Sequence, residues 1–320
     1  MAEAILKEVH VSSMFDLRGV VAVVTGGATG IGLMISTTLI SNGATVFVIG
    51  PVQEDLDRTC KVYNDAAEQT GRHGRMYGIQ GDISQKSEAL RLAEEVGKRV
   101  PHVTVLFNNA GVSEGNAARP EAPTAEAFKK AYFDTVTEEV FDKVLHTNAV
   151  GPYWLTFAFL PLLERWKESG YRGLGGKKFA PQVIMTSSMN GWTKDPATAE
   201  YTFPYLYSKS AIGHATSTLA HELLPLGIRV NGIAPGLFLT DMSAPGSTDE
   251  LGVSRLTDTS KFSFQAPCFQ PPPDDGSKPV NAGSRTDVGA LALFLVSNWF
   301  VNGETVLIDG GTLLIHPSSY

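Results

Sequence analysis

The sequence predicts an α/β fold in which a single doubly wound parallel sheet of about seven strands carries helices on both faces. Three observations support this prediction. Strand-like runs alternate with helical segments along most of the 320 residues. The strand-like runs are nearly all apolar, as in strands that are buried on both faces. No linker or internal repeat divides the chain. We therefore expect an N-terminal extension over residues 1–16 and a single domain over residues 17–320.

The expected strands are short and rich in β-branched residues, and the expected helices show apolar residues at helical spacing. The strands are Val20–Thr25, Ala44–Ile49, Arg75–Gln80, Val103–Phe107, Gln182–Thr186, Ile228–Ile233 and Thr305–Ile308. The helices are Ile31–Ser41, Glu54–Glu68, Gln85–Val100, Glu138–Leu163, Tyr205–Leu224 and Asp287–Ser297. This strand–helix alternation favours parallel pairing, because parallel neighbours need a crossover connection.

Two stretches interrupt the alternation. Glu168–Ala180 is rich in glycine and basic residues and predicts a surface loop before the fifth strand. A longer stretch at about 241–284 contains several prolines and predicts a long loop. A loop of that length in a compact domain is usually a functional lid or a disordered segment.

Composition excludes several classes of function. The net charge is −7 and no long basic run is present, which argues against a nucleic-acid partner. Cys60 and Cys268 form neither a metal-ligand spacing nor a disulfide framework, so we expect no metal and a reducing compartment. The first fifteen residues are too charged for a signal peptide, and the apolar run Tyr153–Leu163 is too short to cross a bilayer. We therefore expect a cytoplasmic protein without a membrane partner.

A glycine-rich turn joins the first strand to the first long helix. It reads Thr25-Gly26-Gly27-Ala28-Thr29-Gly30-Ile31-Gly32. Glycine allows the backbone to turn sharply and to approach a pyrophosphate, and the following helix N-terminus offers free N–H groups to the anion. The spacing differs from the common G-x-G-x-x-G form, but its position between a buried strand and a helix indicates nucleotide binding.

Further motifs follow the later strands in a fixed order. They are Gly81-Asp82-Ile83, Asn108-Asn109-Ala110-Gly111, Asn148 within His146–Gly151, Ser187-Ser188-Met189-Asn190-Gly191, Tyr205-Leu206-Tyr207-Ser208-Lys209, Val230–Gly236 with Thr240, Asn302-Gly303 and Asp309-Gly310-Gly311. In this order, the motifs resemble the short-chain dehydrogenase/reductase family, in its single-domain branch with a Tyr-x-x-x-Lys pair. The resemblance runs from about Leu17 to Gly311 and implies a Rossmann-type sheet.

The resemblance also implies site residues. A catalytic tetrad would consist of Asn148, Ser188, Tyr205 and Lys209. Asp82 would bind the adenine amine, the Asn109 segment would lie along the cofactor ribose, and the segment ending in Thr240 would seat the nicotinamide. The full cofactor-binding set would be Gly26, Thr29, Gly30, Ile31, Gly32, Gly50, Asp82, Ile83, Asn109, Ala110, Gly111, Tyr205, Lys209, Pro235, Gly236, Phe238 and Thr240.

These residue types suit hydride transfer to or from an alcohol carbon. A phenol with a pKa near 10 is a poor base at neutral pH. Tyr205 and Lys209 are four residues apart on a predicted helix, so the ammonium and an oxidised nicotinamide would both stabilise phenolate. Ser188 would donate a hydrogen bond to the substrate oxygen, and Asn148 would connect Lys209 to solvent through a water. The longer gap between Ser188 and Tyr205, around Lys194–Phe203, should reshape the substrate entrance.

The end of the second strand bears on the choice of cofactor. Gly50 stands where NAD-preferring relatives carry an aspartate, so the group that would repel a 2′-phosphate is absent. Pro51 stands where many NADP-preferring relatives carry an arginine. Glu54 and Asp55 follow closely and could still approach the ribose. The sequence favours NADP(H) and leaves NAD(H) open.

The sequence therefore leaves three functions to consider. The first is an NADP(H)-dependent carbonyl reductase that interconverts a ketone and a secondary alcohol. The second is an NAD-dependent secondary alcohol dehydrogenase. The third is a non-catalytic nucleotide-binding sensor, which the complete tetrad disfavours. The resemblance implies a homotetramer or homodimer formed through Glu138–Leu163 and Tyr205–Leu224.

The expected substrate is a small-molecule ketone or alcohol, and a bulky, apolar one is among the alternatives. The resemblance implies that the long loop at about 241–284 is a substrate loop. Aromatic residues of this loop and of the insertion around Lys194–Phe203 either line a roomy apolar pocket for a bulky substrate or anchor their own segments, and the sequence leaves both alternatives open. These aromatic residues are Trp192, Phe203, Phe262, Phe264 and Phe269.

Overall fold

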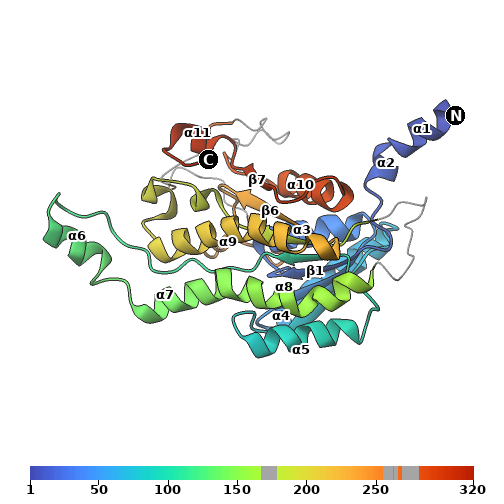
Figure 1. The fold of residues 1–320 in the computed structure, drawn as a ribbon, viewed down its shortest axis with the longest axis horizontal. Coiled ribbons are helices and arrows are strands. Elements are labelled where there is room, and N and C mark those ends of the chain that lie inside the picture. Colours follow the sequence, from blue (N-terminus) through green and yellow to red (C-terminus); the bar gives the residue numbers. More distant parts are fainter. Residues whose placement is uncertain (167–178, 255–261, 263–265, 269–280) are drawn as a thin grey trace.

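The computed structural model contains one sheet of seven strands in the order β3-β2-β1-β4-β5-β6-β7, and every neighbouring pair is parallel (Figure 1). The strands are β1 (Val21–Thr25), β2 (Thr45–Gly50), β3 (Arg75–Gln80), β4 (Val105–Asn108), β5 (Gln182–Thr186), β6 (Arg229–Pro235) and β7 (Thr305–Ile308). The structure describes residues 1–166, 179–254, 262, 266–268 and 281–320. The predicted sheet is confirmed, with strand ends shifted by one or two residues.

Six long helices cover the two faces of the sheet, and each face has its own core. The helices are α3 (Gly30–Ser41), α4 (Gln53–Gln69), α5 (Lys86–Gly97), α8 (Gly151–Arg165), α9 (Phe203–Glu222) and α10 (Arg285–Ser297). Residues of α3, α4 and α10 pack in one core and residues of α5, α8 and α9 in the other. Within β1, Ala22 and Val24 face the first core and Val21 and Val23 the second, which explains the continuous apolar strand.

The strand order reverses at β1. The chain runs outward from β1 to β2 and β3, then returns to place β4 on the other side of β1. Connections at the carboxyl ends of β1 and β4 therefore leave in opposite directions, and a crevice opens between them. Ligands of doubly wound sheets bind in such a crevice.

The predicted helix over Glu138–Leu163 is interrupted. The structure has α7 (Glu138–Leu145), a π-helical turn over His146–Val150 and then α8. The backbone N–H of Gly151 donates to the carbonyl of His146, five residues earlier. Pro152 has no N–H with which to continue the regular α-helical pattern. The π turn carries Asn148, and such turns are frequent at functional sites.

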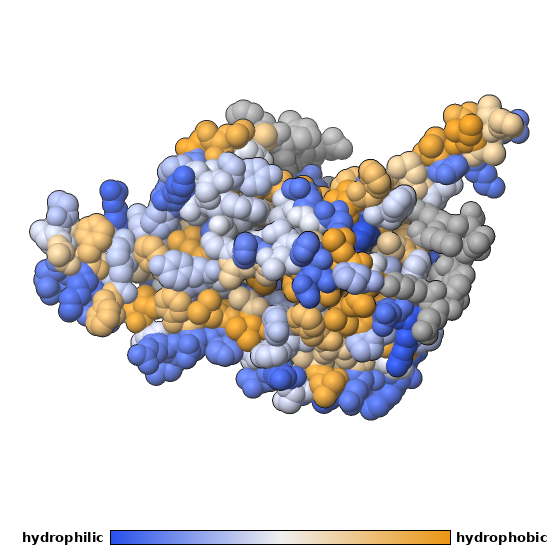
Figure 2. Space-filling model, viewed as in Figure 1, coloured by the Kyte–Doolittle hydropathy of each residue, from blue (hydrophilic) through white to orange (hydrophobic). Residues whose placement is uncertain are grey.

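Short helices outside the predicted pattern lie at the periphery. They are α1 (Ala2–Glu8), α2 (Val11–Met14), α6 (Ala125–Tyr132) and α11 (Thr312–Ile315). None of the residues of α1, α2 or α6 is buried, and α1 extends away from the sheet (Figure 1). Ile5 and Leu6 of α1 are exposed, and Figure 2 shows hydrophobic surface on this N-terminal arm.

Most of the two predicted loops lies outside the described residues, which exclude 167–178, 255–261, 263–265 and 269–280. Phe264 and Phe269 belong to these ranges. Across the part of the chain that is described, none of the helices has the length and apolar character needed to cross a bilayer.

Candidate active site

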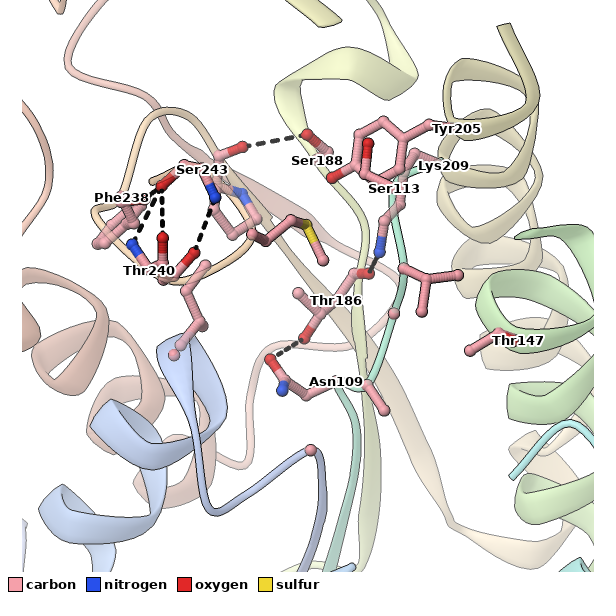
Figure 3. A pocket seen from close by; sticks show the side chains of 18 of the residues that line it. Asn109, Ser113, Thr147, Thr186, Ser188, Tyr205, Lys209, Phe238, Thr240 and Ser243 are labelled. Atoms are coloured by element: carbon pink, nitrogen blue, oxygen red, sulfur yellow. Dashed lines mark hydrogen bonds between the residues drawn. The ribbon is translucent and has the colours of Figure 1, made fainter. Parts of the chain in front are cut away.

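A cavity of about 850 Å³ opens at the carboxyl ends of the central strands. Sixteen of the seventeen predicted cofactor-binding residues line it, Tyr205 and Lys209 among them, together with the predicted catalytic residue Ser188. The other fourteen are Gly26, Thr29, Gly30, Ile31, Gly50, Asp82, Ile83, Asn109, Ala110, Gly111, Pro235, Gly236, Phe238 and Thr240. Figure 3 shows Ser188, Tyr205 and Lys209 on one side of the cavity, and Phe238 and Thr240 on the other. Gly32 and Asn148 are the two predicted site residues outside this lining.

The glycine-rich turn follows β1 directly. Gly26 and Gly30 have φ angles of +62° and +50°, which glycine adopts without strain. Gly32 has a different role, because a Cβ at Gly32 would lie 2.1 Å from the carbonyl oxygen of Gly26. Gly32 therefore allows α3 to pack against the turn. No side chain caps the N-terminus of α3 at Thr29, which leaves its first N–H groups free beside the cavity.

Hydrogen bonds of the Asn109 segment connect the carboxyl ends of β1, β4 and β5. Thr25 Oγ1 accepts hydrogen bonds from the backbone N–H groups of Asn109 and Ala110, both at 3.0 Å. Asn109 Nδ2 donates to the carbonyl of Thr25 at 3.0 Å, and Thr186 Oγ1 donates to Asn109 Oδ1 at 3.3 Å. The floor of the cavity is thus fixed by polar contacts between β1, β4 and β5. Thr25 and Thr186 were not predicted as site residues.

Tyr205 and Lys209 lie on the same face of α9, one turn apart. Lys209 Nζ donates to the carbonyl of Thr186 at 2.9 Å and lies 5.6 Å from the centre of the Tyr205 ring. Burial lowers the pKa of Lys209 to about 8. Burial also raises the pKa of Tyr205, and a hydrogen bond with the Ser188 side chain partly opposes this by lowering it. Without a ligand, the phenol is therefore neutral near pH 7.

Ser188 lies just beyond the end of β5. Its Oγ accepts a hydrogen bond from the backbone N–H of Asn190 at 3.2 Å and donates to the carbonyl of Pro235 at 3.4 Å (Figure 3). These contacts, together with the hydrogen bond to Tyr205, place two hydroxyl groups beside each other in the cavity. A carbonyl oxygen placed between them would meet two donors.

Asn148 is buried in the π turn and is bound to the protein by both ends of its amide. Oδ1 accepts from the N–H of Val112 at 2.8 Å. Nδ2 donates to the carbonyl of Val112 at 2.9 Å and to Ser208 Oγ at 3.0 Å. A Cβ at Gly111 would lie 3.1 Å from Asn148 Oδ1 and 3.3 Å from Lys209 Nζ, so both side chains approach this glycine. The amide thus holds the loop after β4 in place. The expected role of Asn148 in connecting Lys209 to solvent through a water stays a prediction.

Two aromatic residues expected at the pocket do not line it. The ring of Trp192 packs against Tyr320, with centroids 5.0 Å apart, and the ring of Phe203 packs against Tyr132, also at 5.0 Å. Both anchor their own segments, which is the second alternative that the sequence left open. Phe262 does line the cavity.

Several polar residues that the sequence analysis missed line the cavity beside apolar ones such as Met189 and Leu237. Ser113, Asn116, Thr198, Glu200 and Thr202 all line the cavity. Ser113 and Asn116 follow the Asn109 segment, and the other three belong to the region between Ser188 and Tyr205. Among the described residues, no group of three or more histidine, cysteine or acidic side chains is arranged to hold a metal ion.

Comparison with known proteins agrees with this geometry. Residues 20–251 match the sequence model of the short chain dehydrogenase family. A short-chain dehydrogenase/reductase of Diaporthe leptostromiformis, PhomF, is 32% identical over 327 aligned positions that cover all of both chains. The chain belongs to the short-chain dehydrogenase/reductase family, as predicted, and is an NAD(P)-dependent oxidoreductase.

Solved structures share this fold. The active-site complex of RhlG with NADP from Pseudomonas aeruginosa is 27% identical, with a TM-score of 0.67 over 93% of this chain and 98% of that one. A putative short-chain alcohol dehydrogenase from Sinorhizobium meliloti is 26% identical, with a TM-score of 0.68 over 94% of this chain and 99% of that one.

Proposed function

We propose that the protein is an NADP(H)-dependent carbonyl reductase that interconverts a ketone and a secondary alcohol. The observation that carries this proposal is the meeting of Ser188, Tyr205 and Lys209 in the cavity that also contains the glycine-rich turn. An NAD-dependent secondary alcohol dehydrogenase would use the same residues and is the alternative. The intact tetrad argues against a purely nucleotide-binding sensor.

The cavity residues fit a dinucleotide. The turn at Gly26 and Gly30, with the uncapped start of α3, would hold the pyrophosphate. Gly50, Asp82 and Ile83 would surround the adenosine, and the Asn109 segment would lie along the second ribose. The segment from Pro235 to Thr240 would hold the nicotinamide, which supplies or accepts the hydride when bound.

The end of β2 favours NADP(H). Gly50 carries no carboxylate that would repel a 2′-phosphate. Neither Glu54 nor Asp55 lines the cavity, and Asp55 is paired with Arg58 at 2.6 Å. The related RhlG protein forms a complex with NADP, which supports the same choice.

Side chains of the cavity supply the proton and stabilise the negative charge that remains on the donor. During reduction, Ser188 and Tyr205 both hydrogen bond to the substrate carbonyl oxygen, and Tyr205 gives up its proton as the alkoxide forms. The Lys209 ammonium, 5.6 Å from the ring, stabilises the phenolate that remains. Asn148 acts in this scheme by holding the Val112 loop against α9. The reverse sequence oxidises an alcohol.

The test is NADPH oxidation over a panel of ketones by the wild type and by Tyr205→Phe. Removing the proton donor should lower kcat by about 10³-fold. The affinity for NADPH, followed by quenching of protein fluorescence, should stay within about twofold, a factor that corresponds to roughly 0.4 kcal/mol. Equal ketone reduction by both proteins would refute the proposed mechanism.

The cysteines and the exposed aromatic side chains support proposals about the cellular compartment and the oligomeric state. Cys60 is buried and Cys268 exposed, and both are unpaired, which suits a reducing cytoplasm. Tyr153 and Phe157 of α8 are 48% and 37% exposed and contact each other with ring centroids 4.8 Å apart. We propose that α8 and α9 form the contact of a homodimer or homotetramer.

A further inference from the structure

The segment from Trp192 to Thr202 forms one wall of the cavity near the tetrad. It begins soon after Ser188 and ends just before Tyr205, and it contains the short 3₁₀ helix η3 (Pro196–Ala199). Thr198, Ala199, Glu200 and Thr202 of this segment line the cavity. Tyr205 lines the same cavity, so this wall belongs to the space in which a substrate would meet its hydroxyl.

Two adjacent residues of the wall have a left-handed backbone. Glu200 has φ of +50° and Tyr201 has φ of +58°, and they are the only non-glycine residues with positive φ in the described part of the chain. Glycine would adopt this conformation without strain. Strained backbone of this kind persists where the surroundings hold it, and it is frequent at functional sites.

The surroundings fix the Glu200 side chain in place. Asn116 Nδ2 donates to Glu200 Oε2 at 2.6 Å, and Thr202 Oγ1 donates to Asn116 Oδ1 at 3.2 Å. The Tyr201 ring stacks against Tyr132, with centroids 6.4 Å apart. Glu200 Oε1 has no hydrogen-bond partner among the described residues. The carboxylate of this solvent-exposed side chain therefore offers an unused acceptor at the wall of the cavity.

Other charged groups at this end of the cavity already have partners. Lys143 is paired with Glu114, and both oxygens of Asp241 accept from Thr248 Oγ1 at 2.6 Å. An anionic substrate would find Lys143 already paired with Glu114 and would face the Glu200 carboxylate. A substrate with a hydrogen-bond donor would find an unused acceptor.

We propose that Glu200 is a specificity residue and that the substrate is a carbonyl compound with a hydrogen-bond donor, a hydroxyl or an ammonium, at the end distant from the reacting carbonyl. This inference rests on the proposed carbonyl reductase function. It differs from the apolar pocket that was one of the two alternatives left open by the sequence, and it predicts discrimination against carboxylates at the same position.

The experiment uses the whole enzyme with NADPH and four acetophenones substituted at the para position with hydroxymethyl, aminomethyl, ethyl or carboxylate. The wild type should prefer the hydroxymethyl and aminomethyl ketones to the ethyl ketone by about tenfold in kcat/KM, the effect of one charge-assisted hydrogen bond. The carboxylate ketone should be the poorest of the series.

Three variants distinguish recognition of the substrate by the Glu200 carboxylate from a purely structural role of this residue. Glu200→Gly removes the carboxylate and adopts the left-handed backbone without strain, so it should keep or raise Tm while losing the preference. Glu200→Gln should lose the preference for the aminomethyl ketone and keep part of that for the hydroxymethyl ketone, because the amide oxygen still accepts. Asn116→Ala removes the clamp on Glu200 and keeps the carboxylate, so it should retain most of the preference.

The outcomes are distinct. A wild type that reduces the ethyl ketone as well as the two donor-bearing ketones overturns the inference and leaves the proposed function standing. Failure to reduce any of the four ketones with NADPH or NADH counts against the proposed function itself. If Glu200→Gly and Asn116→Ala each lose activity equally on all four ketones, the contact between Glu200 and Asn116 has only a structural role, which also overturns the inference.

Discussion

At the scale of single residues, the site depends on one buried cation. Lys209 is held by the carbonyl of Thr186 and is nearly enclosed, with 4% of its surface exposed. Burial works against its charge and lowers its pKa to about 8, whereas burial raises the pKa of Tyr205 above its ordinary value. The two groups therefore titrate in separate ranges, and the amine loses its proton first as pH rises.

This separation predicts the pH dependence of ketone reduction. Below pH 8 Lys209 is an ammonium and stabilises the phenolate; above pH 8 it becomes neutral while Tyr205 is still protonated. We expect kcat for reduction to fall as pH rises through about 8. Lys209→Arg, which keeps its charge, should lack this fall even if its maximal rate is lower. A decline that begins only near pH 10 would assign the step to Tyr205 instead.

The choice of cofactor also depends on one position. Gly50→Asp would place a carboxylate where a 2′-phosphate is expected, and should weaken NADPH binding by at least tenfold while improving NADH binding. A Cβ at this position would lie 3.2 Å from Leu56 Cδ2, so Gly50→Ala is the matched control for steric effects. Titration of both cofactors by fluorescence measures the change. Similar losses of NADPH affinity in the two variants would show that the charge has no role.

At the scale of elements, local signals predicted the sheet and the motifs but missed contacts between distant segments. Apolar runs and glycine positions identified every strand and the turn at Gly26. The break between α7 and α8 had a local signal in Gly151-Pro152, which helical periodicity concealed. The wall at Glu200 had none, because its conformation depends on Tyr132 and Asn116, which lie far from it in the sequence.

The C-terminal segment, residues 316–320, gives the clearest example of a contact between distant segments that local signals did not predict. It pairs with the start of the cavity wall: the N–H of Lys194 donates to the carbonyl of Pro317 at 2.7 Å, and the N–H of Ser319 donates to the carbonyl of Trp192 at 2.9 Å. His316 Nδ1 lies 2.9 Å from Asp195 Oδ2. Asp195 Oδ1 also accepts from the N–H of Ala197 at the start of η3. The segment thus supports the wall from outside the cavity.

We therefore expect deletion of residues 316–320 to raise KM for the ketone by roughly tenfold, equivalent to about 1.4 kcal/mol of lost substrate binding. The affinity for NADPH should not change, because the glycine-rich turn makes none of these contacts. Deletion of residues 2–8 is the matched control, since α1 buries no residue, and it should alter neither quantity. An unchanged KM after the C-terminal deletion would show that the wall holds its shape alone.

At the scale of the whole molecule, the two cores account for the interior but leave aromatic side chains exposed on α8 and α9. Tyr207 of α9 is 58% exposed and packs against Phe141 of α7, with ring centroids 5.8 Å apart. Tyr153 and Phe157 of α8 add to this set. Exposed aromatic rings gathered on neighbouring helices are typical of protein–protein interfaces, whose cores are enriched in such residues.

These exposed aromatic side chains predict the assembly and its response to mutation. The chain mass is 34.3 kDa, so light scattering should give a multiple of that value for the wild type. Phe157→Asp buries a charge without a partner if α8 lies in the interface, and it should shift the protein toward smaller species. Leu90→Lys on α5, at a side chain that is 57% exposed, is the control and should leave the mass unchanged. If the wild type has the mass of one chain at micromolar concentration, the exposed aromatic side chains have another use, and the tetrad must work within a monomer.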